Sequence, residues 1–292
     1  MRPTFGVTII PSTTPRSDPV AEAVLAEELG FDLVSVWDHP HGENPSFESW
    51  TLMTWMAART RRITVASNVL GLPFRLPALT AKMAESLDRL SGGRLVLGLG
   101  AGASEAEFAG YGAPVRSPGE KIDALAEAIE IIRGTWSQPV FTYDGRYYRN
   151  EGALLEPKPE RHIPIWLGTY GPRALELTGR VADGWIPSMR YAPPPDAMRK
   201  REIVLHALDA SGRDAAAFDW AYNVSARIGG DAARDPDQQI AGEPDEVIER
   251  LVELLEMGFT TLNFWLGGRR DEQMRRLAGE VLPDVRRLDG GS

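Results

Sequence analysis

The stretch Arg62–Gly102, RITVASNVLGLPFRLPALTAKMAESLDRLSGGRLVLGLGAG, contains a strand, a helix and a second strand in succession. Its first part, Ile63–Ser67, is a short apolar run of the kind that forms a buried parallel strand. A helical pattern begins at Pro77 and ends before Gly92-Gly93, and Arg94–Gly100 is a second apolar strand. This unit predicts an α/β fold with a parallel sheet.

The same alternation continues on both sides of this stretch. Eight strand-like runs are present: Phe5–Ile10, Leu33–Trp37, Ile63–Ser67, Arg94–Gly100, Pro164–Leu167, Gly184–Ile186, Tyr222–Ile228 and Thr261–Leu266. Helical patterns separate them. Eight β/α units predict a (β/α)8 TIM barrel, with one domain over residues 1–292. An open, doubly wound sheet is the alternative.

Two long segments interrupt the repeat, and both are expected to cover or shape a pocket. One, Gly102–Gly119, follows strand four. The other, Pro139–Pro159, precedes strand five and contains a hairpin signal with an Asp-Gly turn at Tyr143–Tyr148. Gly229–Ala241 is expected to be a mobile loop, and Leu288–Ser292 a frayed end.

Composition excludes several classes of function. The 292 residues carry a net charge of −9 without a basic stretch, which argues against nucleic acid and anionic membranes as partners. No cysteine is present, so disulfides, thiolate metal sites and a cysteine nucleophile are excluded. No segment of the sequence resembles a membrane span. We therefore expect a soluble, cytoplasmic protein that acts on a small-molecule substrate.

Leu33–His39, LVSVWDH, is an apolar strand that ends on an Asp-His pair. Enzymes with an α/β barrel carry their active sites at the carboxyl ends of the strands. His39 is thus placed for proton transfer, with Asp38 beside it to orient or charge the imidazole. The alternative is a loop histidine that caps local backbone.

Two glycine-containing segments follow strands. Gly98–Gly102, GLGAG, lacks the helix and the acidic residue of a dinucleotide site, and we interpret it as backbone that lets a flat ring lie close; a flexible turn is the alternative. Leu167–Ala174, LGTYGPRA, leads into a helix whose free N–H groups, with Arg173, suit the phosphate of a cofactor. A plain turn with Pro at the first helical position would explain that segment equally well.

Other chemistries lack the residues that they need. His39-Pro40-His41 could open a metal site, but no further ligands follow at later strand ends, so no metal is expected. No lysine ends a strand, and no G-x-S-x-G is present. Four tryptophans lie on or beside strands, of which one or two are expected to touch a ligand: Trp37, Trp166, Trp185 and Trp265.

Together these features resemble the luciferase-like monooxygenase superfamily, and within it the oxidoreductases that depend on the deazaflavin coenzyme F-420 (F420). The resemblance covers nearly the whole chain. It is carried by Glu28–His39, ELGFDLVSVWDH, by Arg62–Gly102, by Glu105–Gly112, EAEFAGYG, and by Gly179–Trp185, GRVADGW.

The resemblance implies a barrel that binds the cofactor ring at the carboxyl ends of its strands, and it assigns residues to that ring. Asp38 and His39 would lie at the ring, and a bulge at Asn68-Val69, with a cis peptide bond in relatives, would lie behind it. Gly100 and Gly102 would line the cofactor, and its phosphate-bearing tail would meet Thr169, Tyr170, Gly171 and Arg173. Relatives often form homodimers, which we expect here.

The resemblance therefore implies an enzyme that transfers a hydride between F420 and a small organic substrate. Relatives that oxidise glucose 6-phosphate have Glu and Trp where this chain has Ala103 and Glu43, which makes that substrate doubtful. The alternatives are a monooxygenase that uses reduced FMN and oxygen, and a barrel that binds the cofactor without turnover.

Overall fold

A closed ring of eight parallel strands forms the centre of the computed structural model, which describes residues 2–230 and 235–289. Its strands, in ring order, are β1 (Thr4–Ile9), β2 (Leu33–Val36), β3 (Thr64–Ser67), β5 (Leu95–Gly100), β8 (Ile165–Leu167), β9 (Gly184–Trp185), β10 (Asp219–Ile228) and β12 (Thr261–Leu266). The pairing of β9 with β10 closes the ring, and β12 pairs with both β10 and β1. The predicted (β/α)8 barrel is confirmed, and the open sheet is excluded.

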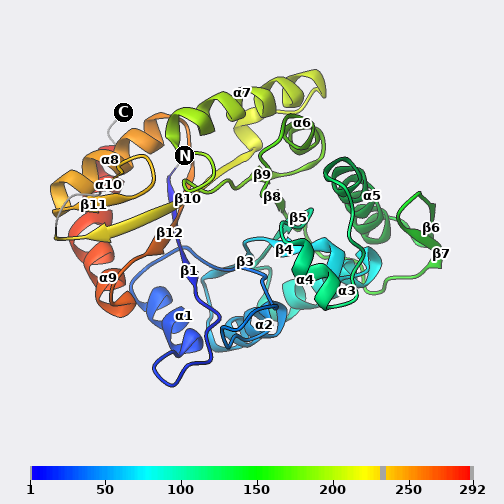
Figure 1. The fold of residues 1–292 in the computed structure, drawn as a ribbon, viewed down its shortest axis with the longest axis horizontal. Helices are drawn as coiled ribbons and strands as arrows, with labels where there is room; N and C mark the ends of the chain where they lie inside the picture. The colour runs from blue at the N-terminus through cyan, green and yellow to red at the C-terminus, as the bar shows by residue number, and fades with distance from the viewer. Residues whose placement is uncertain (1, 231–234, 290–292) are drawn as a thin grey trace.

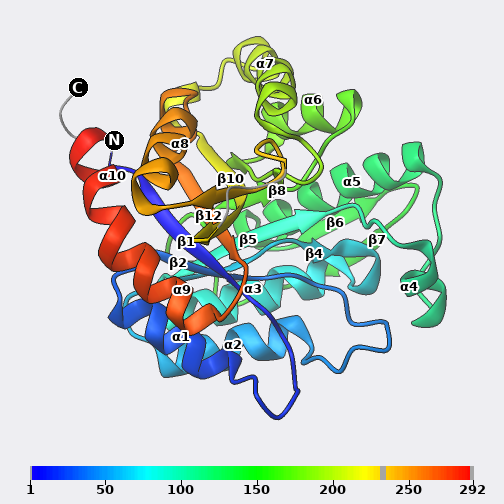
Figure 2. The same cartoon turned by 60° about the vertical axis from the view of Figure 1, so that its left-hand side comes forward.

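Helices surround the ring on its outside (Figure 1). They are α1 (Pro19–Glu28), α2 (Ser49–Arg59), α3 (Pro77–Ser91), α4 (Glu105–Gly110), α5 (Pro118–Ser137), α6 (Pro172–Val181), α7 (Pro194–Ala210), α8 (Pro244–Glu256), α9 (Arg270–Arg276) and α10 (Leu282–Asp289). Turned by 60°, the molecule shows the strands crossing between α1, α2 and α9 on one side and α6 and α7 on the other (Figure 2). Local signals fix several ends: Asp18 caps α1, and Gly92, with a left-handed φ of 75°, ends α3.

The interior of the barrel is layered. Because side chains alternate along a strand, residues two apart on the same strand enter successive layers. An apolar layer near the amino ends of the strands consists of Leu33, Ala66, Val96, Trp166, Ile186 and Ala221. Above it lies a polar layer of Thr8, Ser35, Asn68, Asn223 and Asn263. Trp37 and Trp265 follow at the carboxyl ends, stacked with ring centroids 4.4 Å apart.

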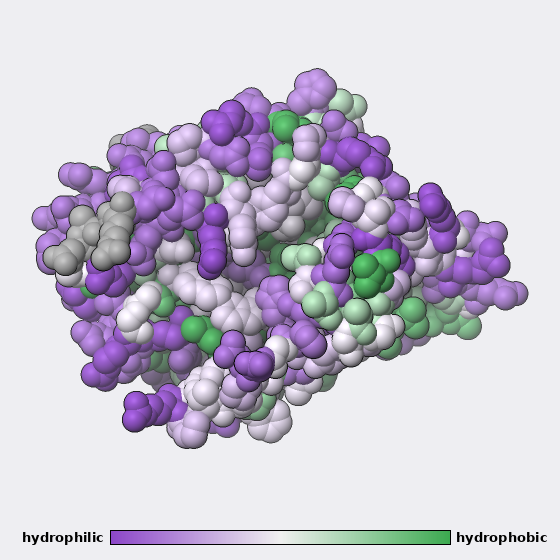
Figure 3. All heavy atoms as spheres, in the orientation of Figure 1, coloured by the Kyte–Doolittle hydropathy of each residue, from purple (hydrophilic) through white to green (hydrophobic). Residues whose placement is uncertain are grey.

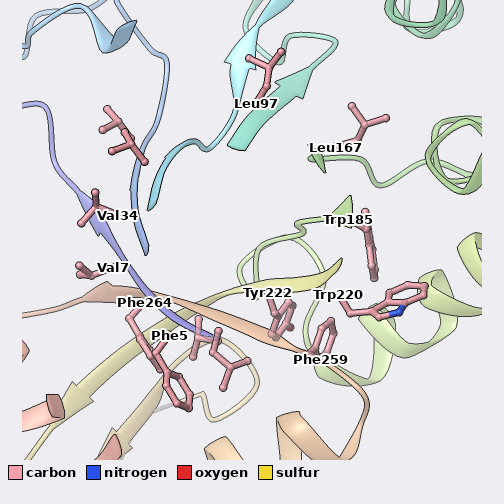
Figure 4. Packing of buried hydrophobic residues seen from close by; sticks show 14 of the residues in the cluster. Phe5, Val7, Val34, Leu97, Leu167, Trp185, Trp220, Tyr222, Phe259 and Phe264 are labelled. Carbon is pink, nitrogen blue, oxygen red and sulfur yellow. The ribbon is translucent and has the colours of Figure 1, made fainter. Parts of the chain in front are cut away.

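The main core lies between the strands and the helices. Figure 4 shows buried side chains from several strands, among them Val7, Val34 and Leu97. Tyr222 of β10 stacks on Phe259 with ring centroids 4.4 Å apart. These residues hold the barrel rigid, which fixes the positions of the loops at the carboxyl ends of the strands.

The insertions between β5 and β8 contain structure of their own. The predicted hairpin is present as the antiparallel pair β6 (Phe141–Asp144) and β7 (Arg149–Ala153), whereas α4 was not evident from the sequence. A two-residue strand, β4 (Leu70–Gly71), pairs with β5.

Two expected loops differ from the structure where it describes them. Ile240–Gly242 forms strand β11, which pairs with β10, so the expected loop Gly229–Ala241 is wrong at its carboxyl end, and its residues 231–234 lie outside the described residues. Of the expected frayed end, Leu288 and Asp289 belong to α10, and residues 290–292 lie outside the described residues.

Candidate active site

Two adjoining cavities open at the carboxyl ends of the strands. The larger has a volume of about 770 Å³ and the smaller about 680 Å³. His39, Asn68, Ser188, Tyr191 and Asn223 line both, so the two cavities meet at these residues. Figure 3 shows a hollow near the centre of this face, with pale and green residues inside hydrophilic rims.

All ten residues predicted for the site line the larger cavity: Asp38, His39, Asn68, Val69, Gly100, Gly102, Thr169, Tyr170, Gly171 and Arg173. They come from the ends of four strands, β2, β3, β5 and β8, which the closed barrel brings to one edge. We call the larger cavity the ring cavity and the smaller one the outer cavity.

His39 is held by an acid that was not predicted for this role. Its Nδ1 lies 3.0 and 3.1 Å from the two carboxylate oxygens of Glu107, on α4. Glu107 is largely buried, with 13% of its side chain exposed, whereas the His39 side chain is 55% exposed. With Nδ1–H donating to Glu107, Nε2 is the nitrogen that can exchange a proton with a ligand. The expectation that Asp38 orients the imidazole is wrong.

Asp38 is instead the centre of a separate charged group. Its fully buried carboxylate accepts hydrogen bonds from Arg75 at 2.6 and 3.2 Å and from the Gly71 N–H at 2.9 Å. Arg75 also donates to Glu48 at 2.6 Å. Burial opposes the charged form of Arg75, but Asp38 and Glu48 outweigh it and raise the pKa of the guanidinium. Asp38 therefore fixes β4 at the edge of the ring cavity.

Glu48 links this group to α2. It caps the helix by accepting hydrogen bonds from the N–H groups of Trp50 and Thr51 at 3.0 and 2.7 Å. Burial would raise the pKa of Glu48, but the hydrogen bonds from Thr51, Trp50 and Arg75 outweigh it and lower the pKa below its ordinary value of 4.5.

The wall of the ring cavity behind Asn68 is made by Val69. The Asn68–Val69 peptide bond is cis, as predicted. A Cβ at Gly98 would lie 1.9 Å from the Ser67 carbonyl oxygen, so this glycine lets β3 approach β5. Gly102 has a φ of +90°, and a Cβ there would lie 2.1 Å from Phe108. Contacts within the protein therefore require both glycines, whatever ligand lies against them.

Two helix N-termini face the far end of the ring cavity. Pro118 and Gly119 of α5 and Pro172 of α6 line it, so the positive ends of both helix dipoles lie at this end. Lys121, whose side chain is 12% exposed, adds a positive charge and lies 3.9 Å from Glu105. Arg173 also lines the cavity, but it is paired with Asp123 at 2.7 Å.

The side chains of Thr169 and Tyr170 make hydrogen bonds within the protein. The Thr169 hydroxyl lies 2.7 Å from that of Thr178, which ties the loop to α6. The Tyr170 hydroxyl accepts a hydrogen bond from the Ser188 N–H at 3.0 Å. Burial raises the pKa of Tyr170, and the hydrogen bonds with Ser188 offset only part of this effect. The phenol is therefore neutral and positions the strand end that both cavities share.

The four tryptophans divide into two pairs. Trp166 and Trp185 are 3% and 0% exposed and belong to the core. Trp37 and Trp265 line the outer cavity. Thus two of the four line a cavity, and contact of one or two of them with a ligand stays a prediction.

Four residues of the site escaped the sequence analysis: Arg75, Glu107, Lys121 and Asn223. One signal could have identified Glu107. Ser104 caps α4 by accepting from the Glu107 N–H at 3.4 Å, and Ser three residues before an acid is a helix-start pattern. Asn223 gives no signal, because an amide within a strand is common outside active sites.

Comparisons with known proteins agree with this geometry. Residues 5–235 match the family described as luciferase-like monooxygenase. An "F420-dependent glucose-6-phosphate dehydrogenase" of Microbacterium testaceum is 30% identical over 90% of this chain and 92% of its own. A "5,10-methylenetetrahydromethanopterin reductase" of Archaeoglobus fulgidus is 32% identical over 77% of this chain and 67% of its own.

A solved structure shares the fold over nearly its whole length. It is an F420-dependent secondary alcohol dehydrogenase in complex with an F420-acetone adduct, with a TM-score of 0.86 and 20% identity. The match covers 98% of this chain and 99% of that one.

Within the described residues, no helix has the length and apolar character to cross a membrane. In the same part of the chain, no three acidic or histidine side chains are grouped as they would be around a metal ion.

Proposed function

The chain belongs to the luciferase-like monooxygenase family, and on that premise we propose that it is an F420-dependent oxidoreductase acting on a small organic substrate. The observation that carries the proposal is the ring cavity, which runs from His39 to the N-termini of α5 and α6. Two relatives that match 90% and 92% of this chain are named F420-dependent glucose-6-phosphate dehydrogenase, which supports the choice of cofactor.

The residues of the ring cavity fit this cofactor. Val69, Leu70 and Ile186 give apolar walls suited to a flat ring, and the two helix N-termini with Lys121 suit an anionic tail. When bound, a deazaflavin supplies or accepts a hydride. We assign Asn68, Val69, Gly100 and Gly102 to the ring.

The tail of the cofactor would lie at the opposite end of the cavity. We assign Thr169, Tyr170, Gly171 and Arg173 to it, together with Lys121. Asp38 would act on the ring through Gly71, whose N–H it holds at 2.9 Å.

His39 is the proposed catalytic acid or base. It lines both cavities, so it can reach a substrate in the outer cavity beside a ring in the other. Glu107 is the proposed positioning residue, since its hydrogen bond to Nδ1 fixes the orientation of the imidazole.

We do not propose glucose 6-phosphate as the substrate of this chain, although relatives are named for it. Ala103 and Glu43 replace the acid and the tryptophan found in enzymes for that sugar phosphate.

We also propose a cytoplasmic homodimer. Three exposed leucines support association: Leu76, directly before α3, and Leu79 and Leu90 on it, at 68, 55 and 81% exposure. Trp55 of α2 is 60% exposed.

Titration of the purified protein with F420 and with FMN tests the choice of cofactor. Quenching of Trp37 and Trp265 fluorescence should report tighter binding of F420. Lys121→Gln should weaken F420 binding about tenfold, or ~1.4 kcal/mol, because it removes a charge from the tail site. The same variant should bind a deazaflavin core without the phosphate-bearing tail as the unaltered protein does.

The contrary results have distinct meanings. Micromolar binding of FMN with no response to F420 would favour the flavin monooxygenase. Binding of F420 without reduction or oxidation of any substrate in a broad panel of alcohols and ketones would favour a binding protein without turnover.

A further inference from the structure

The outer cavity has features that the proposed function does not explain. It shares five residues with the ring cavity, His39 among them, so a molecule in it would lie against the exposed face of a bound ring. Its volume of about 680 Å³ accommodates a ligand of drug-like size. Its lining therefore carries information about the substrate.

One side of the outer cavity is aromatic. Trp37 and Trp265 stack nearly parallel, with an interplanar angle of 17° and ring centroids 4.4 Å apart. Trp265 is 40% exposed although it lies on β12, a strand whose other residues are buried. An indole left open beside Ile10 at the end of a barrel strand favours a flat, apolar ligand.

The floor of the outer cavity is polar and uncharged. The side-chain amides of Asn68 and Asn223 are paired, with N–O distances of 2.7 and 3.1 Å. Behind them, Asn263 donates to the Asn223 carbonyl oxygen at 2.6 Å, which fixes the Asn223 amide. Asn223 is 91% buried by the protein, so its amide is a preorganised partner for one oxygen of a ligand.

The charge of the outer cavity differs from that of the molecule. The chain has 41 acidic residues and a net charge of −9, yet no Asp or Glu of its described part lines this cavity. Arg190 does line it, and its guanidinium lies 5.9 Å from the centroid of the Tyr191 ring. Among the described residues Arg190 has no ion-pair partner, unlike Arg173 with Asp123. A guanidinium in this setting suits a carboxylate.

We propose that the substrate is a flat, largely aromatic ketone, or the matching alcohol, that carries a carboxylate. This inference rests on the proposed function. The reacting oxygen would lie at Asn223 and His39, the flat body against Trp37 and Trp265, and the carboxylate at Arg190. In the reducing direction the carbonyl carbon gains a hydride from reduced deazaflavin, the oxygen gains a proton from His39, and an alcohol and the oxidised deazaflavin result.

Equilibrium binding to the F420-loaded protein tests the proposal with three ligands of one shape. They are 4-acetylbenzoate, the neutral 4-acetylbenzamide and the cationic 4-acetylphenyltrimethylammonium, titrated by calorimetry. The carboxylate should bind at least about tenfold more tightly than the amide, and the cation most weakly. Arg190→Gln should remove the preference for the carboxylate and leave amide binding unchanged.

Two further variants separate the parts of the site. Trp265→Leu should weaken all three ligands by similar factors. Arg180→Gln removes an exposed positive charge outside both cavities and should change none of the affinities.

Equal affinity for carboxylate and amide, tighter binding of the cation, or no binding of any of the three would overturn the proposal. Failure of F420 to bind in the separate cofactor titration would instead count against the proposed function. Because Arg190 is exposed, its variant is expected to fold, and its melting temperature checks this.

Discussion

His39 and Glu107 are 68 residues apart in sequence, and their contact defines the proposed chemistry. The carboxylate fixes which nitrogen of the imidazole faces the ligand. Asp38, the neighbour in sequence, does not, because Arg75 and Gly71 occupy its carboxylate. Adjacent residues on a strand end point in different directions, so adjacency alone is a poor guide to partnership.

Replacing His39 should separate proton transfer from cofactor binding. His39→Ala is expected to lower kcat by about 10²–10⁴-fold, the usual contribution of a positioned acid or base, and to leave F420 affinity nearly intact. Asp38→Ala should instead weaken F420 binding, because β4 loses its anchor. Full turnover in the His39 variant would show that the proton comes from elsewhere.

Replacing Glu107 should lower turnover without weakening cofactor binding. Glu107→Ala removes the hydrogen-bond partner of His39 Nδ1 and should lower kcat by about tenfold, whereas Glu107→Gln keeps an oxygen that can accept from Nδ1–H and should restore most of the rate. A purely structural role would leave the glutamine variant as impaired as the alanine variant. Glu105→Gln, on the same helix but 64% exposed, is the matched control and should leave kcat unchanged.

At the scale of the element, α2 is tied to the site through its capping residue. Glu48 has a lowered pKa in the folded protein, so its contribution to stability is present above the ordinary value of 4.5 and is lost as pH falls through the lowered value. Glu48→Gln should therefore melt at lower temperature at pH 7 and show a weaker dependence of Tm on pH below 4.5.

The expected loss of stability in Glu48→Gln follows from the role of Glu48 as the cap of α2. A loss of about 1 kcal/mol, typical of caps, lowers Tm by about 2–4 °C in a chain of this length. Glu43→Gln, an exposed substitution nearby, is the control. An unchanged acid dependence in Glu48→Gln would contradict the assignment.

Elements were predictable from the sequence where their pattern was long or sharply bounded. Thr261–Leu266 has the predicted bounds, and Pro172 begins α6 as expected. The six-residue helix α4 is too short to show helical periodicity, and β9 has only two residues. The cavity-lining residues were predicted from strand ends and family resemblance. Their partners Arg75 and Glu107 were not, because those contacts join segments that local pattern cannot relate.

At the scale of the whole molecule, α3 presents an unusual outer surface. Leu79 and Leu90 lie eleven residues apart, about three helical turns, on one side of the helix. If two copies associate there, Leu79→Arg combined with Leu90→Arg should give a monomer by light scattering, because burying each leucine contributes about 1.5–3 kcal/mol. Leu154→Arg, at an equally exposed leucine after β7, should not change the mass. A dimer that survives the double change would place the interface elsewhere.

The apolar layer of the barrel lies near the amino ends of the strands, and its six side chains include Leu33 and Trp166, at 2 and 3% exposure. Both cavities that His39 lines lie at the opposite, carboxyl ends of the strands. If the proposed function holds, substrate and product pass through these cavities, so product must leave before the next substrate molecule binds.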